Sequence, residues 1–177
     1  MAERTLQTLG APVLRQSARP VAPQDPQLQR LIDDLIDTCA RANGVGIAAP
    51  QVGESLRLFI VASRPNPRYP NAPWMEPTAM LDPEILAVDG EPVYGWEGCL
   101  SVPGQRGRVA RHPWLRVRYR DRQGEEQTTE LTDFVARIFQ HELDHLEGCL
   151  FVDRVVSPED LLSEAEYQTR LSQGTLS

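Results

Sequence analysis

The stretch of the sequence that most directly suggests chemistry is QHELDH, residues 140–145. Its two histidines, His141 and His145, are four positions apart, so on a helix both imidazoles project from one face and can bind one metal ion. Glu142 lies beside them and can act on a water molecule at that ion. The three fixed positions of this HExxH pattern rarely coincide by chance in a chain of this length. The pattern therefore indicates a metal site, with two packed helix histidines as the alternative.

The two histidines leave open which residue supplies the third ligand. Cys99, in WEGCLSVPG, is one source, and a site of two histidines and a cysteine leaves a fourth position open for water, as catalytic sites do. Glu164 or Glu166, in PEDLLSEAEYQTR, is the other source, as in thermolysin-like metallopeptidases. A closed site with Cys149 as the fourth ligand would instead make the chain a non-catalytic metal-binding module.

The composition is that of a globular protein and excludes several function classes. The chain has 177 residues, of which 41% are hydrophobic and 24% charged, enough for one domain with a continuous core. All 18 basic residues are arginine, so Schiff-base chemistry through a lysine is excluded. The net charge of −7 disfavours broad binding of nucleic acid, which needs clustered positive charge. The three cysteines do not resemble a disulfide framework.

No segment has the pattern of a membrane span or an export signal. Apolar runs stay shorter than the roughly 20 residues needed to cross a bilayer. The N-terminal stretch MAERTLQTLGAPVLRQ lacks the apolar core of a signal peptide. We therefore expect a cytoplasmic protein, or an organellar one if a transit peptide has been removed.

Two segments have the spacing of helices. Residues 26–43 place hydrophobic side chains at helical intervals, with Asp25 as a cap. Cys39 falls on the hydrophobic face of this helix and is expected in the core. The HExxH pattern lies in a second helix, which we expect to begin at 132–133 and to end at Gly148.

The remaining segments predict short strands. Residues 56–62, 81–88 and 114–120 have strand-like composition, and the last faces EEQTTE across a turn at DRQG. Residues 44–53 are too rich in glycine and alanine for an ordinary strand, and a proline-rich loop is expected over 63–80. A run of arginines is expected on the surface: Arg106, Arg108, Arg111, Arg116, Arg118, Arg120 and Arg122. These elements predict an α+β fold, in which short, mostly antiparallel strands pack around a central helix that carries HExxH.

Three blocks of the sequence together resemble the peptide deformylase family. They are GVGIAAPQVG at 44–53, EGCLS at 97–101 and QHELDH at 140–145, in the family's order, and GAPVLRQ and LFVDR also look like family signatures. The resemblance covers nearly the whole chain and is weakest in the loop at 63–78 and in the final helix. It implies a single catalytic domain over residues 1–177 that removes the N-formyl group from the initiator methionine of new polypeptides and releases formate. The partners implied are the N-formyl-methionyl nascent polypeptide and the ribosome, with no specific nucleic acid and no membrane.

The resemblance also implies roles for individual residues. Cys99, His141 and His145 would hold a divalent ion, with iron(II) as the productive metal and zinc, nickel or cobalt as substitutes. Glu142 would take a proton from the attacking water and pass it to the leaving amine. The oxyanion of the reaction would receive hydrogen bonds from the side-chain amide of Gln51 and the backbone N–H of Leu100.

A substrate-binding region is expected beside these residues. Gly44 and Gly46 allow close approach of a substrate backbone, which can add to this segment like a further strand. An apolar pocket is needed for the methionine side chain, and Glu97 and Arg106 are expected to orient ligands or substrate. The residues expected to bind substrate are Val45, Gly46, Glu97, Gly98, Arg106, Phe134 and Ile138.

Overall fold

The computed structural model describes residues 3–176, which form three α-helices and eight strands linked by loops and short 3-10 turns. In chain order these elements are α1 (Pro26–Arg41), β1 (Gly46–Ala48), β2 (Leu58–Val61), β3 (Thr78–Asp89), β4 (Val93–Cys99), β5 (Val102–Arg111), β6 (Trp114–Arg120), β7 (Glu126–Thr132), α2 (Asp133–Leu146), β8 (Leu161–Ser163) and α3 (Glu164–Gln173).

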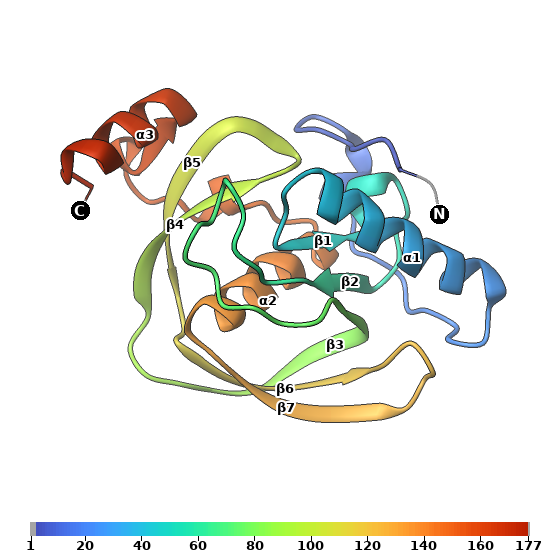
Figure 1. The fold of residues 1–177 in the computed structure, drawn as a ribbon. Coiled ribbons are helices and arrows are strands. Elements are labelled where there is room, and N and C mark those ends of the chain that lie inside the picture. Colours follow the sequence, from blue (N-terminus) through green and yellow to red (C-terminus); the bar gives the residue numbers. More distant parts are fainter. Residues whose placement is uncertain (1–2, 177) are drawn as a thin grey trace.

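The strands form two sheets in which every paired strand is antiparallel to its neighbour. One sheet has the order β1-β2-β3-β6-β7, and the other has the order β4-β5-β8. In Figure 1, helix α2 lies in the middle of the molecule, with β3, β6 and β7 below it and β4 and β5 beside it. The predicted α+β class with a central HExxH helix is therefore confirmed. No helix among residues 3–176 is long and apolar enough to cross a membrane.

Helix α1 forms where the sequence predicts it. The Asp25 carboxylate accepts a hydrogen bond of 2.8 Å from the Gln27 backbone N–H, which satisfies one of the free donors at the helix start. Its hydrophobic face packs against β1 and β2, and Cys39 on that face is 1% exposed, as predicted.

Helix α2 also begins and ends as predicted, and its hydrophobic face packs on the five-stranded sheet. Phe139 meets Phe59 of β2 edge to face, with ring centroids 5.2 Å apart. Burial of each such side chain stabilises the fold by roughly 1.5–3 kcal/mol. After the helix, Gly148 has a φ of 73°, and a Cβ there would lie 2.7 Å from the Arg15 backbone. Only glycine fits this turn, so the end of the metal-site helix is fixed.

The predicted hairpin of β6 and β7 is confirmed, but the arginine run is only partly on the surface. Arg116 lies opposite Glu130 and pairs with it at 3.0 Å, as expected for an exposed ladder. Arg106 and Arg111 of β5 are instead 1% and 4% exposed. Their prediction as surface residues was wrong because each pairs with a carboxylate on another element: Arg106 pairs with Glu164, and Arg111 pairs with Glu97 and Asp144.

Three strand predictions also need correction. Within 44–53, Gly46–Ala48 does form a strand, because Gly46 leaves room for the Glu142 and Ile138 side chains of α2 while the strand pairs with β2. Strand β3 begins at Thr78, inside the predicted loop, since Thr78–Leu81 pair with β2. Strands β4, β5 and β8 were not predicted. Residues 63–77 make up most of the connection between β2 and β3, and we call them the 63–77 loop.

Candidate metal centre

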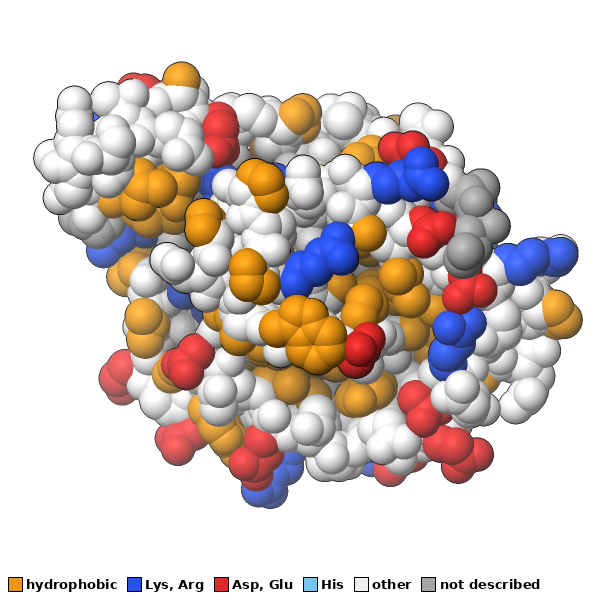
Figure 2. Space-filling model, viewed as in Figure 1, with side chains coloured by type: hydrophobic (Ala, Val, Ile, Leu, Met, Phe, Trp, Pro, Cys, Tyr) orange, Lys and Arg blue, Asp and Glu red, His pale blue; other side chains and the backbone are white. Residues whose placement is uncertain are grey.

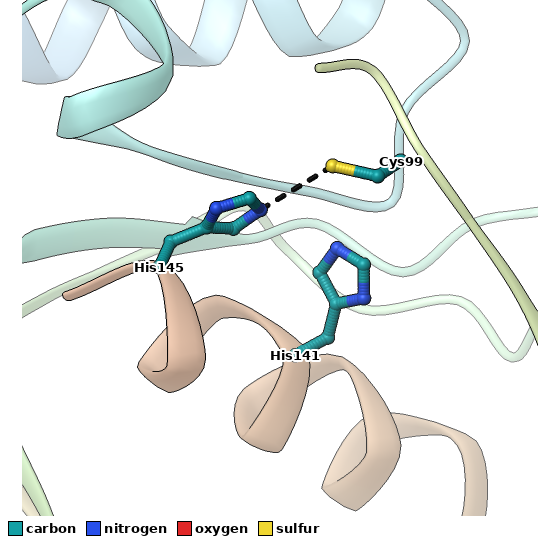
Figure 3. A group of neighbouring side chains, drawn as sticks. All are labelled: Cys99, His141 and His145. Atoms are coloured by element: carbon teal, nitrogen blue, oxygen red, sulfur yellow. Dashed lines mark hydrogen bonds between the residues drawn. The ribbon is translucent and has the colours of Figure 1, made fainter. Parts of the chain in front are cut away.

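Cys99, His141 and His145 come together at one nearly buried point. Cys99 ends β4, and the two histidines project from α2 toward it (Figure 3). The Cys99 Sγ atom lies 3.4 Å from the His145 Nε2 atom, and the ligand atoms of the three residues lie within 4.8 Å of one another. Within residues 3–176, no other group of three His, Cys, Asp or Glu side chains is placed to share a metal ion.

The other candidate ligands are engaged elsewhere. The Glu164 carboxylate accepts a hydrogen bond of 2.8 Å from the Arg106 guanidinium. The Glu166 carboxylate accepts one of 3.1 Å from the Ser163 hydroxyl at the start of α3. Cys149 lies outside the group of metal-binding side chains. The geometry therefore favours Cys99 as the third ligand over the thermolysin-like arrangement.

The three side chains suit a divalent transition-metal ion. A thiolate and two imidazoles are ligands that zinc and iron(II) both accept, and they leave a fourth position open for water. Burial alone would raise the pKa of Cys99, but the neighbouring His145 and His141 hold that pKa well below its ordinary value. The site therefore favours the thiolate, which is the form of cysteine that binds metal ions.

A buried network of charges orients His141. The Glu97 carboxylate lies 2.8 Å from His141 Nδ1 and accepts hydrogen bonds of 2.9 Å from Arg111 and 2.8 Å from Arg137. Burial would raise the pKa of Glu97, but the hydrogen bonds with Arg111 and His141 hold it well below its ordinary value. Arg111 also donates to Asp144 on α2 at 2.7 Å. Because Nδ1 is occupied in this way, the opposite ring nitrogen of His141 is left for the metal.

Glu142 is a buried carboxyl group beside the metal-binding side chains. It is 3% exposed, and burial raises its pKa to about 7, although His141 and His145 act to lower it. Its Oε2 atom has no hydrogen-bond partner among residues 3–176. A carboxyl group with such a pKa can take up a proton and give it back near neutral pH.

Gln51 is held with its amide nitrogen toward Cys99. Its Oε1 atom accepts a hydrogen bond of 2.9 Å from the Ala48 N–H. Its Nε2 atom donates to the Ser101 hydroxyl at 3.1 Å and lies 3.5 Å from the Cys99 Sγ atom. Leu100 directly follows Cys99, and both residues line a pocket that is described below. The structure thus places both residues predicted for the oxyanion site next to the metal-binding group.

A pocket opens beside these residues and is lined by six of the seven residues predicted to bind substrate. Those six are Val45, Gly46, Glu97, Gly98, Phe134 and Ile138. Arg106 is the exception, because it does not line the pocket and pairs with Glu164 behind it. Four lining residues were missed, namely Arg68, Tyr69, Trp96 and Arg137. Trp96 directly precedes EGCLS and could have been found from that position, whereas Arg68 and Tyr69 lie in a proline-rich segment without periodicity.

Comparisons with known proteins agree with this geometry. Residues 3–160 match the family model described as polypeptide deformylase. The chain is 61% identical over 168 residues to peptide deformylase 2 of Nostoc sp. (strain PCC 7120), with 94% of each chain covered. It is 47% identical over 158 residues to peptide deformylase 2 of Shewanella oneidensis, covering 89% of this chain and 87% of the relative.

Solved structures are similar over most of the chain. The Met-Ala-Ser-bound class I type b peptide deformylase from Acinetobacter baumannii superposes with a TM-score of 0.84 at 47% identity, covering 87% of this chain and 99% of the other. Peptide deformylase from Thermotoga maritima superposes with a TM-score of 0.80 at 38% identity, covering 89% of this chain and 100% of the other.

Proposed function

The chain belongs to the polypeptide deformylase family, and we propose that it carries out the family's reaction with a divalent ion held by Cys99, His141 and His145. It is a metal-dependent hydrolase that removes the N-formyl group from nascent polypeptides. The assignment of the metal ligands rests on one observation. Cys99 lies within ligand distance of His141 and His145, beside the buried Glu142.

The side chains around this group fit hydrolysis of a formyl amide. When bound, the ion supplies Lewis-acid chemistry that brings the pKa of water close to neutral. Glu142 accepts the proton of the attacking water and delivers it to the amine nitrogen as the bond between the formyl carbon and that nitrogen breaks. The Gln51 amide and the Leu100 N–H donate hydrogen bonds to the oxygen that becomes negative during attack. Formate and the free amino terminus are the products.

The substrate backbone fits along β1. This strand is an edge of its sheet and pairs with β2. Val45 and Gly46 at its start line the pocket, where an extended peptide can hydrogen-bond to them. The methionine side chain then enters the apolar part of the pocket, where Val45, Phe134 and Ile138 are the candidate contacts. This orientation brings the formyl group toward Glu142.

The proposal also covers the identity of the metal ion, the substrate polypeptide and the cellular compartment. A thiolate with two imidazoles suits iron(II), with zinc, nickel and cobalt as substitutes. The N-formyl-methionyl nascent polypeptide is the substrate, so the enzyme works near the ribosome and in the compartment where such chains are made, the cytoplasm or an organelle. We further infer that residues 1–177 act as one catalytic domain.

Formate release from a defined peptide tests the proposed reaction. Anaerobically prepared protein should release formate from formyl-Met-Ala-Ser and leave its internal peptide bonds intact. Formate is measured enzymatically, the peptide by mass spectrometry, and the metal by elemental analysis of the same sample. N-acetyl-Met-Ala-Ser, which carries an additional methyl group, is the control and should react far more slowly. Internal cleavage without formate would indicate a peptidase and refute the proposal.

A methyl group added at Gly46 should disturb catalysis without unfolding the protein. A Cβ at this position would lie 2.5 Å from Glu142 Oε1 and 2.9 Å from the side chain of Ile138, so the Glu142 carboxylate must move. Because a displacement of about 1 Å at a reacting group can cost on the order of 10²-fold in rate, Gly46→Ala should lower kcat by about that factor. In the Glu142→Ala background the same substitution should lower kcat by a much smaller factor, because the carboxylate that it displaces is gone and only its contact with Ile138 remains. Equal losses in both backgrounds would contradict this explanation.

A further inference from the structure

Arg106 is a fully buried arginine that joins α3 to the rest of the molecule. Its side chain is 1% exposed, and its guanidinium donates to the Glu164 carboxylate at 2.8 Å and 3.4 Å. Glu164 is the first residue of α3, and Tyr167, one turn later, has its ring centroid 4.8 Å from the Arg106 guanidinium carbon. Among residues 3–176, Glu164 is the one carboxylate that pairs with Arg106.

The other side of Arg106 contacts the wall of the substrate pocket. The Tyr69 ring centroid lies 5.0 Å from the guanidinium carbon, and the Arg68 carbonyl accepts a hydrogen bond of 3.4 Å from the same guanidinium. The side chain also packs against Gly98, where a Cβ would lie 3.2 Å from the Arg106 Cδ and Nε atoms. Arg106 thus supports three pocket-lining residues from behind, namely Arg68, Tyr69 and Gly98.

Tyr69 connects this support to the apolar part of the pocket. Its hydroxyl accepts a hydrogen bond of 3.2 Å from the Gly98 N–H, next to the metal ligand Cys99. Its ring packs 5.4 Å from that of Phe134, a candidate contact for the methionine side chain. The position of Tyr69 therefore sets the distance between the 63–77 loop and β4.

Helix α3 has a second contact with the pocket. The Tyr167 ring lies 5.8 Å from that of Trp96, which lines the pocket from β4. Figure 1 shows α3 at the end of the molecule beside β4 and β5, and Figure 2 shows hydrophobic side chains directly beneath it and around the 63–77 loop. The helix is thus packed against the back of the pocket, although it lies outside the residues matched by the family model.

We propose that Glu164 and Tyr167 of α3 are positioning residues, which hold Arg106 against Tyr69 and Gly98 and so set the width of the pocket for the residue that carries the formyl group. The proposal rests on the proposed function, because the pocket is assigned to substrate by that function. Removal of Glu164 leaves the buried guanidinium without its partner, and such a charge moves toward water or pulls its neighbours with it. Either movement displaces Tyr69 and widens the pocket.

Kinetics of α3 variants test this coupling. In Glu164→Gln and Tyr167→Leu, KM for formyl-Met-Ala-Ser should rise on the order of 10-fold, the effect of a misfit of about one methylene, while kcat and metal content stay near wild type. Tyr167→Phe keeps the ring that contacts Arg106 and Trp96, so its KM should equal that of the wild type. Arg170→Gln, on the same helix and without a contact to Arg106, is the matched control and should change neither constant.

Hydrogen exchange provides a measurement that does not depend on activity. In Glu164→Gln and Tyr167→Leu, backbone amides of the 63–77 loop and of Gly98 should exchange faster than in wild type and in Arg170→Gln. This comparison can be made on metal-free protein, so a wild-type protein that releases no formate would refute the proposed function and leave the coupling still tested. Unchanged exchange at the loop and at Gly98, together with an unchanged KM in both variants, would overturn the positioning role.

Discussion

Cys99→Ala protein should be purified without a stoichiometric metal ion and should release no formate. Two imidazoles alone provide neither the negative charge nor the third fixed ligand that the ion needs, and metal affinity falls accordingly. Metal content and formate release measured on one preparation test both expectations. Cys149→Ala, which removes a thiol outside the site, is the matched control and should retain both properties. A fully loaded, active Cys99→Ala protein would contradict the proposed mechanism.

Alkylation of the wild-type cysteines tests the same ligand without a mutation. Cys99 should be protected from iodoacetamide in the metal-loaded protein and should react after a chelator removes the ion, because its thiolate is then free. Cys39 should remain unmodified in both states, since it is 1% exposed and burial raises its pKa to about 12. Peptide mapping by mass spectrometry separates the two sites.

Glu142→Ala should keep its metal and lose most of its turnover. The carboxyl group is not a ligand in the Cys99–His141–His145 group, so the ion has no need of it. A positioned acid–base group contributes typically 10²–10⁴-fold to a rate, and kcat should fall within about that range. Glu142→Gln, which preserves the shape of the side chain but cannot accept the proton, should lose a similar factor. Near-normal kcat in a fully metal-loaded variant would remove Glu142 from its proposed role.

The metal centre could be predicted from the sequence to a large extent because its residues lie in short blocks with fixed spacing. His141 and His145 share a helical face. Cys99 was one candidate for the third ligand beside Glu164 and Glu166, and only the resemblance to the deformylase family singled it out. Helices α1 and α2 were predictable for a related reason. Both combine hydrophobic periodicity with a recognisable first residue. These features depend on residues close in sequence, so they predict the helix without knowledge of tertiary contacts.

Strands β4 and β5 could not be predicted because their sequences lack alternation. VYGWEGC and VPGQRGRVAR combine glycine with charged residues, and their pattern resembles a loop. The explanation lies in tertiary structure: Gly98 makes room for Arg106, while Glu97 binds His141 and Arg111. These residue types are explained by contacts with side chains on neighbouring elements, and hydrophobic periodicity carries no information on such contacts.

The surface prediction for Arg106 and Arg111 failed for the same reason. An arginine is usually solvated, and burial is tolerated only with a well-placed carboxylate. For Arg111 those carboxylates are Glu97 and Asp144, which reach it from β4 and α2. The burial of the two arginines therefore depends on tertiary contacts with these carboxylates, which could not be predicted from the sequence.

The wide separation along the chain of the residues that meet at the metal centre has a consequence for biosynthesis. Gln51 follows β1, Cys99 ends β4, and His145 lies near the end of α2, so the centre is complete only when strands of both sheets and α2 have folded together. A polypeptide emerges from its N-terminus onward and folds as its domains become available. A new copy of this enzyme therefore acquires its metal-binding geometry late in its own synthesis, after residues through His145 are free to fold. A chain interrupted between Cys99 and α2 carries the Gln51 and Cys99 blocks but lacks the helix that supplies the two histidine ligands.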